Sequence, residues 1–132
     1  MDAVTAEGRA AARLIAEKDT MASEVTRLLY EESPELAVRY GPIGRERCLE
    51  DIRYTIDHLI PAVDLGRPAL FVTYVMWLDE LLRARNVATR DVVRSLELLE
   101  QVARTRLATD ESDAVAASIR AGLASLPAGS SA

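Results

Sequence analysis

Apolar residues recur at three- and four-residue intervals along most of the chain, the spacing of side chains on one face of an α-helix. No segment shows the strict alternation expected of a half-buried strand. We therefore predict an all-α fold of six to seven helices with short connections. The predicted helices cover residues 5–17, 20–30, 34–40, 44–64 and 68–86, followed by one that starts at Thr89 and a last one that starts at Thr109.

Proline, glycine and small polar residues mark the predicted helix ends. Ser33 is expected to cap a short helix, with Pro34 in its first turn, where a missing N–H costs nothing. Gly41 is expected to stop that helix, Gly66 to end the next one and Thr89 to cap a later one. Three helices carry apolar stripes that would face a core. The stripes are Ile52, Ile56, Leu59 and Val63; Phe71, Tyr74, Val75, Leu78, Leu81 and Leu82; and Val92, Val93, Leu96, Leu99, Val102 and Leu107.

The chain length of 132 residues and a hydrophobic content of 49% fit one globular domain. We predict that residues 1–126 form this domain and that 127–132, Pro-Ala-Gly-Ser-Ser-Ala, form a flexible tail or the stub of a linker. Both a four-helix bundle with N-terminal additions and a globin-like fold fit the predicted helices. Periodicity alone does not choose between them.

Charge and composition narrow the function classes. A net charge of −5 gives no electrostatic reason to bind nucleic acid. No apolar run approaches the roughly 20 residues of a membrane span, and the first residues lack the features of a signal peptide. A single cysteine cannot form an internal disulfide, which fits the cytoplasm.

The predicted helix 44–64 carries a second stripe beside its apolar one. It consists of Cys48, Asp51, Thr55 and His58, which are three, four and three residues apart and so share a face. Arginines 45, 47 and 53 surround the thiol, and Cys48 is expected to lie near the first helical turn. Nearby guanidinium groups and the helix dipole would lower the pKa of a thiol there, which favours a nucleophilic or conjugating cysteine. The plainer alternative is an inert core cysteine, an Asp51 paired with Arg47 on the surface, and a structural histidine.

The segment Arg47-Cys48-Leu49-Glu50-Asp51-Ile52-Arg53-Tyr54 resembles the chromophore-attachment segment of the phycobiliproteins, with a Cys-x-x-Asp-x-x-Tyr core. Weaker likeness extends over about residues 40–107, where Gly66 and the run 78–80 fall at similar places. The resemblance implies a globin-like fold that holds a linear tetrapyrrole (bilin) rather than haem.

In that family the cysteine adds to a double bond on the first ring of the bilin, and the aspartate accepts hydrogen bonds from the inner pyrrole N–H groups. By resemblance, Cys48 would be the attachment point and Asp51 the pyrrole partner. A carboxylate beside a buried cation favours the protonated pigment. The remaining candidate binding residues are Arg45 and Arg47 for the propionates, Tyr54 of the motif, Thr55 and His58 along the helix, and Tyr74 and Trp77 from the next helix.

The chain also departs from the family pattern. Glu50 stands where the family usually has a propionate-binding arginine, and Asp91 and Val92 stand where it often has aromatic residues. The chain before Cys48 is too short for the N-terminal helical hairpin through which phycobiliprotein subunits pair. The sequence therefore looks more like a bacterial relative: a stand-alone bilin-associated globin, or the globin module found beside cobalamin-binding domains in some regulators.

Other chemistries have less support. His58, the only histidine, lies on the helix equivalent to the distal one, and residues 68–86 offer no proximal haem ligand. One cysteine and one histidine cannot complete a zinc site, and there is no phosphate loop or nucleophile elbow. Cys48 and His58 are ten residues apart, about 15 Å along a helix, so they cannot act as a nucleophile and its base. We expect a non-enzyme without a metal.

Two functional hypotheses follow. In the first, the protein binds a bilin, covalently or not, as a photosensor, a pigment carrier or an accessory of bilin biosynthesis. In the second, it is a pigment-free sensory or regulatory module that acts as a homodimer through apolar surfaces of its first or last helices. Under the second, Cys48 and Asp51 are ordinary packing and capping residues.

Overall fold

The computed structural model describes residues 5–127, and all regular structure in this range is α-helical. The elements are α1 (Ala6–Glu32), α2 (Glu35–Asp64), α3 (Pro68–Ala84), α4 (Thr89–Arg106) and α5 (Thr109–Ala124). The all-α prediction is confirmed, but these residues form five helices instead of six to seven. Residues 1–4 and 128–132, which include most of the predicted tail, lie outside the described residues.

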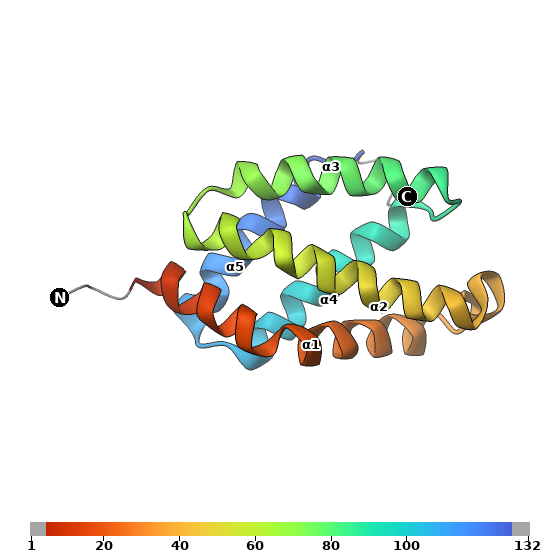
Figure 1. Ribbon diagram of the computed structural model, residues 1–132, viewed down its shortest axis with the longest axis horizontal. Coiled ribbons are helices and arrows are strands. Elements are labelled where there is room, and N and C mark those ends of the chain that lie inside the picture. The colour runs from red at the N-terminus through yellow and green to blue at the C-terminus, as the bar shows by residue number, and fades with distance from the viewer. Residues whose placement is uncertain (1–4, 128–132) are drawn as a thin grey trace.

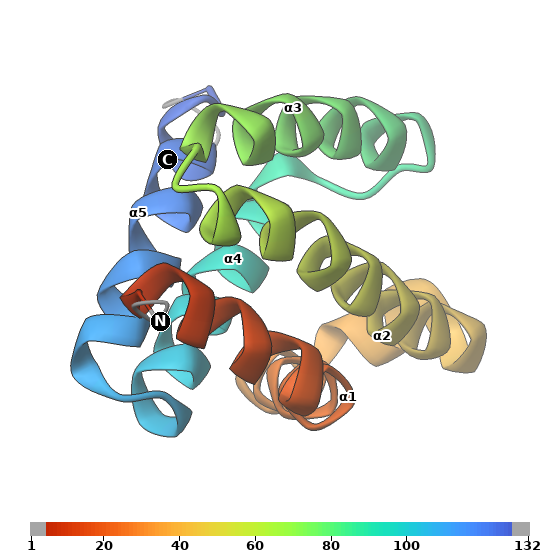
Figure 2. The same ribbon diagram turned by 60° about the vertical axis from the view of Figure 1, so that its left-hand side comes forward.

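The helices form two layers around one core. Helices α1, α2 and α3 lie side by side with alternating direction, and α4 and α5 cross behind them (Figures 1 and 2). The predicted apolar stripes of α2, α3 and α4 face the space between the layers, with Leu81 and Val93 only partly buried. The largest fully buried side chains include Leu14, Met21, Ile56, Leu59, Phe71, Leu96 and Ile119, so all five helices contribute to the core.

The prediction of two separate helices at residues 5–17 and 20–30 is wrong, because both segments belong to the single helix α1. The polar residues between the two expected helices remain helical and pair with α2. Lys18 Nζ lies 2.9 Å from Asp57 Oδ1, and Asp19 Oδ1 lies 3.1 Å from Arg53 Nε. Charged residues that resemble a loop in the sequence therefore link two helices.

The expected short helix before Gly41 is continuous with the next one in hydrogen bonding, but its backbone is interrupted. Gly41 has φ 70° and ψ −175°, which is not helical and is essentially restricted to glycine. Two predicted caps are wrong: Ser33 ends α1, and Ala88 rather than Thr89 precedes the first residue of α4. Residues 35–40 thus form a separate turn of helix at the start of α2.

The turns after α2 and α3 have the same form. Gly66 (φ 62°) and Asn86 (φ 66°) take the left-handed conformation that ends many helices. In each turn, two backbone N–H groups donate to carbonyls in the last turn of the helix. After α2, Gly66 N donates to Val63 O and Arg67 N donates to Ala62 O. After α3, Asn86 N donates to Arg83 O and Val87 N donates to Leu82 O. The prediction that Gly66 ends its helix is confirmed.

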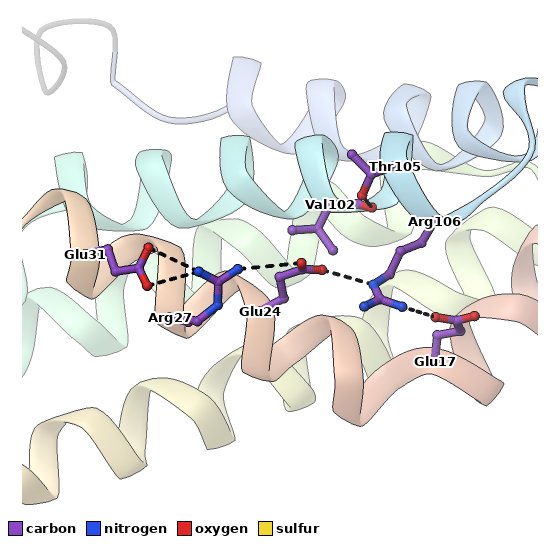
Figure 3. Close-up of polar contacts among 7 residues, drawn as sticks. All are labelled: Glu17, Glu24, Arg27, Glu31, Val102, Thr105 and Arg106. Atoms are coloured by element: carbon purple, nitrogen blue, oxygen red, sulfur yellow. Dashed lines mark hydrogen bonds and ion pairs between the residues drawn. The ribbon is translucent and has the colours of Figure 1, made fainter.

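Ion pairs along the outer edge of α1 join it to α4 (Figure 3). The guanidinium of Arg106 lies between two carboxylates, with Nε 3.0 Å from Glu24 and an Nη atom 3.0 Å from Glu17. Arg27 extends the row from Glu24 to Glu31. Partly exposed pairs contribute roughly 0.2–1 kcal/mol each, so this row orients α4 on α1 while the core supplies most of the stability.

Candidate ligand-binding pocket

A pocket of about 200 Å³ opens between the end of α1, the middle of α2 and the connection from α3 to α4. Its walls are mostly apolar, with a few charged and hydroxyl groups. This combination is typical of small-molecule sites, in which apolar walls bind and a few polar groups orient the ligand. The lining residues include Leu29, Tyr30, Leu36, Tyr40, Arg47, Cys48, Asp51, Thr55, Leu78, Leu82, Arg85, Asp91, Val92 and Ser95.

The interruption at Gly41 shapes one wall of this pocket. The turn of helix before it contributes Leu36 and Tyr40 to the lining. The hydroxyl of Tyr40 lies 3.4 Å from Asp91 Oδ2, and an Nη atom of Arg39 lies 3.6 Å from the same oxygen. These contacts fasten residues 35–40 to the start of α4 and so close the pocket on that side.

Four of the predicted site residues meet at this pocket: Arg47, Cys48, Asp51 and Thr55. They come from successive turns of one face of α2, as their spacing predicts. Cys48 and Asp51 therefore both line one cavity. The sequence-based expectation that they share a cleft is consistent with this geometry.

The predicted activation of Cys48 is wrong. Burial is the main cause that raises the pKa of its thiol to about 11, and the charge of Asp51 acts in the same direction, while the Thr26 side chain and the charge of Arg45 offset only part of the effect. Cys48 also lies nearly two turns beyond Gly41, where the helix dipole no longer acts strongly. Desolvation exceeds the attraction of the arginines, so the group is a neutral thiol at pH 7.

Burial likewise raises the pKa of Asp51, and the charges of Arg85 and Arg47 oppose that rise. Asp51 has no ion-pair partner within 4 Å among the described residues, so the surface pair with Arg47 does not form. Its carboxylate is thus partly desolvated and open to a ligand. A cation or an N–H donor in the pocket would satisfy it.

The two arginines expected to bind propionates differ in position. Arg47 lines the pocket, whereas Arg45 stacks over the ring of Tyr30, with its guanidinium carbon 4.9 Å from the ring centroid. Arg85, which follows α3, also lines the pocket, although it was not among the predicted residues. The side chains of Arg47 and Arg85 have no hydrogen bond or ion pair within the part of the chain that the structure describes. The pocket therefore carries two guanidinium groups free to bind an anion.

The other predicted residues lie outside the pocket and form a cluster of rings on α2 and α3. His58 stacks on Tyr74 with ring centroids 4.4 Å apart, and its Nδ1–H donates to the carbonyl of Tyr54 at 3.1 Å. Tyr54 and Trp77 lie at the exposed side of this cluster, with centroids 6.3 Å apart. We call these four residues the aromatic cluster. Its link to the pocket is the hydroxyl of Thr55, which lies 2.8 Å from that of Tyr74.

Comparison with known proteins adds no relative: no family model matches the chain, and no curated protein sequence is significantly similar to it. Between residues 5 and 127, none of the helices combines the length and apolarity needed to cross a bilayer. Over the same range, no three His, Cys, Asp or Glu side chains are grouped so that they could hold a metal ion. The pocket and the residues around it are therefore the features that bear on function.

Proposed function

We propose that the chain is a non-enzymatic, globin-like protein related to the phycobiliproteins, and that its pocket binds a linear tetrapyrrole without a covalent bond. The observation that carries the proposal is the common pocket of Cys48 and Asp51. These are the two residues that the attachment-segment resemblance assigns to the pigment.

The chemistry of the pocket supports this ligand class. A linear tetrapyrrole has an apolar conjugated body, inner N–H groups that become cationic on protonation, and two propionates. The apolar walls suit the body, the partly desolvated carboxylate of Asp51 suits the N–H groups, and the guanidinium groups of Arg47 and Arg85 suit the propionates.

The size of the pocket limits how the ligand is held. A volume of about 200 Å³ is smaller than the roughly 300–1,000 Å³ of sites that enclose a drug-sized ligand. Part of the tetrapyrrole therefore occupies the pocket and the rest lies at its mouth. Such partial enclosure favours reversible binding.

The state of Cys48 supports binding without attachment. Addition of a thiol to a double bond of the pigment would form a C–S bond and move the thiol proton to the neighbouring carbon. The thiolate is the reactive species, and a pKa of about 11 leaves very little of it at pH 7. In this proposal Cys48 lines the binding site and does not react with the ligand.

The test is a titration of the full chain with biliverdin, followed by absorbance. We expect saturable binding with a shifted red band, and at least tenfold weaker binding by Asp51→Asn. Glu50→Gln is the matched control, because Glu50 is exposed on the same helix and does not line the pocket. Absence of saturable binding at tens of micromolar, or equal losses in both variants, would contradict the proposal.

Denaturing electrophoresis of the complex tests the mode of binding. Loss of the colour from the protein band supports reversible binding. Colour that stays with the wild-type band but not with Cys48→Ala would overturn that part of the proposal and favour attachment.

A further inference from the structure

Helices α2 and α3 lie next to each other (Figure 2), and five of the eight large exposed apolar side chains among the described residues belong to the middle of α2, to α3 or to the turn between them: Tyr54, Leu65, Leu70, Met76 and Trp77. Tyr54 and Trp77 are 49% and 48% exposed, and Leu65 and Leu70 are 60% and 45% exposed. By contrast, the large exposed apolar residues include only Ile15 from α1 and none from α5 within residues 5–127. We therefore look for a dimer surface on the α2–α3 side instead of on the first or last helices.

Two of these residues form a preorganised surface along α3. Leu70 and Trp77 are seven residues apart and so lie on one face of the helix, two turns from each other. The indole of Trp77 is held by neighbouring rings, with centroids 5.9 Å from Tyr74 and 6.3 Å from Tyr54. A ring fixed in this way loses little conformational entropy when a partner covers it, which favours binding.

The charges at the two ends of α3 complement each other. Arg67 precedes the helix, Glu80 lies in its penultimate turn, and both side chains are exposed. Neither side chain has an ion pair or a hydrogen bond within residues 5–127, although the adjacent Arg83 is paired with Asp79. Leu70 lies three residues after Arg67, and Trp77 lies three residues before Glu80.

The spacing of these four residues is symmetric about a point between Thr73 and Tyr74, and it fits a second copy of the same chain. If two α3 helices meet antiparallel on a twofold axis near Thr73, Arg67 of each copy lies opposite Glu80 of the other. The same register places Leu70 opposite Trp77. A twofold interface must be self-complementary in this way, because every contact between the two copies occurs twice, once in each direction.

We propose that two copies of the chain associate through their α3 helices, packed antiparallel in this register with the aromatic cluster at the interface. The proposal gives a specific interface to the second functional hypothesis, in which the protein acts as a homodimer. It does not depend on a ligand in the pocket, so failure of the tetrapyrrole proposal would leave it intact.

The experiment is sedimentation equilibrium of the full chain over a range of concentrations. We expect a dimer, and we expect Trp77→Glu to give a monomer of unchanged helix content. Ile15→Glu is the control, because Ile15 is exposed on α1, away from the proposed interface. A wild-type chain that stays monomeric at 100 µM or higher, or a dimer dissociated equally by both variants, would overturn the proposal.

A charge exchange tests the register without touching an apolar residue. Either Arg67→Glu or Glu80→Arg alone would place like charges opposite each other at both ends and weaken the dimer about tenfold. The double variant would restore opposite charges and wild-type affinity. A double variant that is as weak as the singles would rule out this register.

Discussion

The hydroxyl of Thr55 bonds two groups at once: it donates to the carbonyl of Asp51 at 2.8 Å and accepts from the hydroxyl of Tyr74 at 2.8 Å. A hydroxyl has one proton, so Tyr74 must be the donor of the second bond. Thr55 lines the pocket, and Tyr74 belongs to the aromatic cluster. This bond is the direct polar connection between the candidate ligand site and the proposed dimer surface.

We predict that Thr55→Val destabilises the protein more than Tyr74→Phe does. The valine variant leaves the buried Tyr74 hydroxyl without a partner, which costs about 1–3 kcal/mol. The phenylalanine variant removes that hydroxyl while Thr55 keeps its bond to Asp51, so the loss is nearer 0.5–1.5 kcal/mol. Urea unfolding measures both values.

The double variant is the control for this interpretation. With the tyrosine hydroxyl gone, valine at position 55 no longer leaves a hydroxyl at position 74 without its partner. The double variant should therefore be more stable than Thr55→Val alone. Strictly additive losses would mean that the hydroxyl of Tyr74 is not confined by this bond.

Alkylation of Cys48 should be slow at neutral pH and speed up toward a midpoint near pH 11. The reason is that burial raises the pKa of the thiol to about 11, and only the thiolate reacts. The rate of iodoacetamide modification across pH 7–11 measures this directly. A midpoint at or below pH 8.5 would instead indicate an activated cysteine.

The same shift predicts how stability depends on alkaline pH. Below about pH 9 the thiol is protonated in both the folded and the unfolded chain, and its contribution is fully present. As pH rises from 9 to 11, the unfolded chain loses the proton first, so the folded state loses stability, by on the order of 2 kcal/mol. Cys48→Ala should lack this component of the pH dependence, whereas tyrosine ionisation is common to both proteins and cancels in the comparison.

Asp51→Asn should stabilise the empty protein at pH 7 while weakening tetrapyrrole binding. Burial raises the folded-state pKa of Asp51, so its contribution is favourable at low pH and is lost as pH rises through that pKa. Asparagine does not ionise, and its advantage at pH 7 is under about 1 kcal/mol because the site is partly exposed.

The difference in unfolding free energy between the Asp51→Asn variant and wild type should vanish by about pH 3, where the carboxyl group is protonated in both states. Thermal unfolding from pH 3 to pH 7 follows it. A variant that is less stable than wild type at pH 7 would show that the ionised carboxylate is held by partners and is not available to a ligand.

Gly122→Ala should destabilise the protein by about 1–3 kcal/mol, although alanine favours a helix by about 1 kcal/mol over glycine. A β-carbon at this position of α5 would lie 2.9 Å from Val75 Cγ2 and 3.1 Å from Phe71 Cδ2 of α3. Both side chains are fully buried and have little room to move. A second substitution, Val75→Ala, should make room for the added methyl group. The double variant should therefore lose less stability than the sum of the losses measured for the two single variants.

The all-helical class and the end of α2 could be predicted from the sequence because their signals are local. Gly66 and Pro68 determine the turn between α2 and α3 almost alone. The division of α1 was mispredicted because Lys18 and Asp19 look like loop residues until Asp57 and Arg53 of α2 are placed beside them. Such pairs join residues more than 30 positions apart, and no local pattern contains them.

The candidate site divides in the same way. Helical spacing correctly placed Cys48, Asp51 and Thr55 on one face. It could not show that Arg85 would take the place expected for Arg45, since Arg85 reaches the pocket from another helix. Nor could spacing give the protonation state of Cys48, because desolvation depends on the walls that other elements supply.

The non-helical backbone at Gly41 sets the direction of residues 35–40 relative to the rest of α2. Residues 35–40 carry Tyr40 against Asp91 and join the rest of α2 through a conformation that a β-carbon would disfavour. This turn is therefore joined to the rest of α2 through Gly41 and to the start of α4 by the contacts of Tyr40 and Arg39 with Asp91. The absence of a side chain at position 41 thus permits the backbone bend that brings Leu36 and Tyr40 into the pocket wall, although Gly41 itself does not line the pocket.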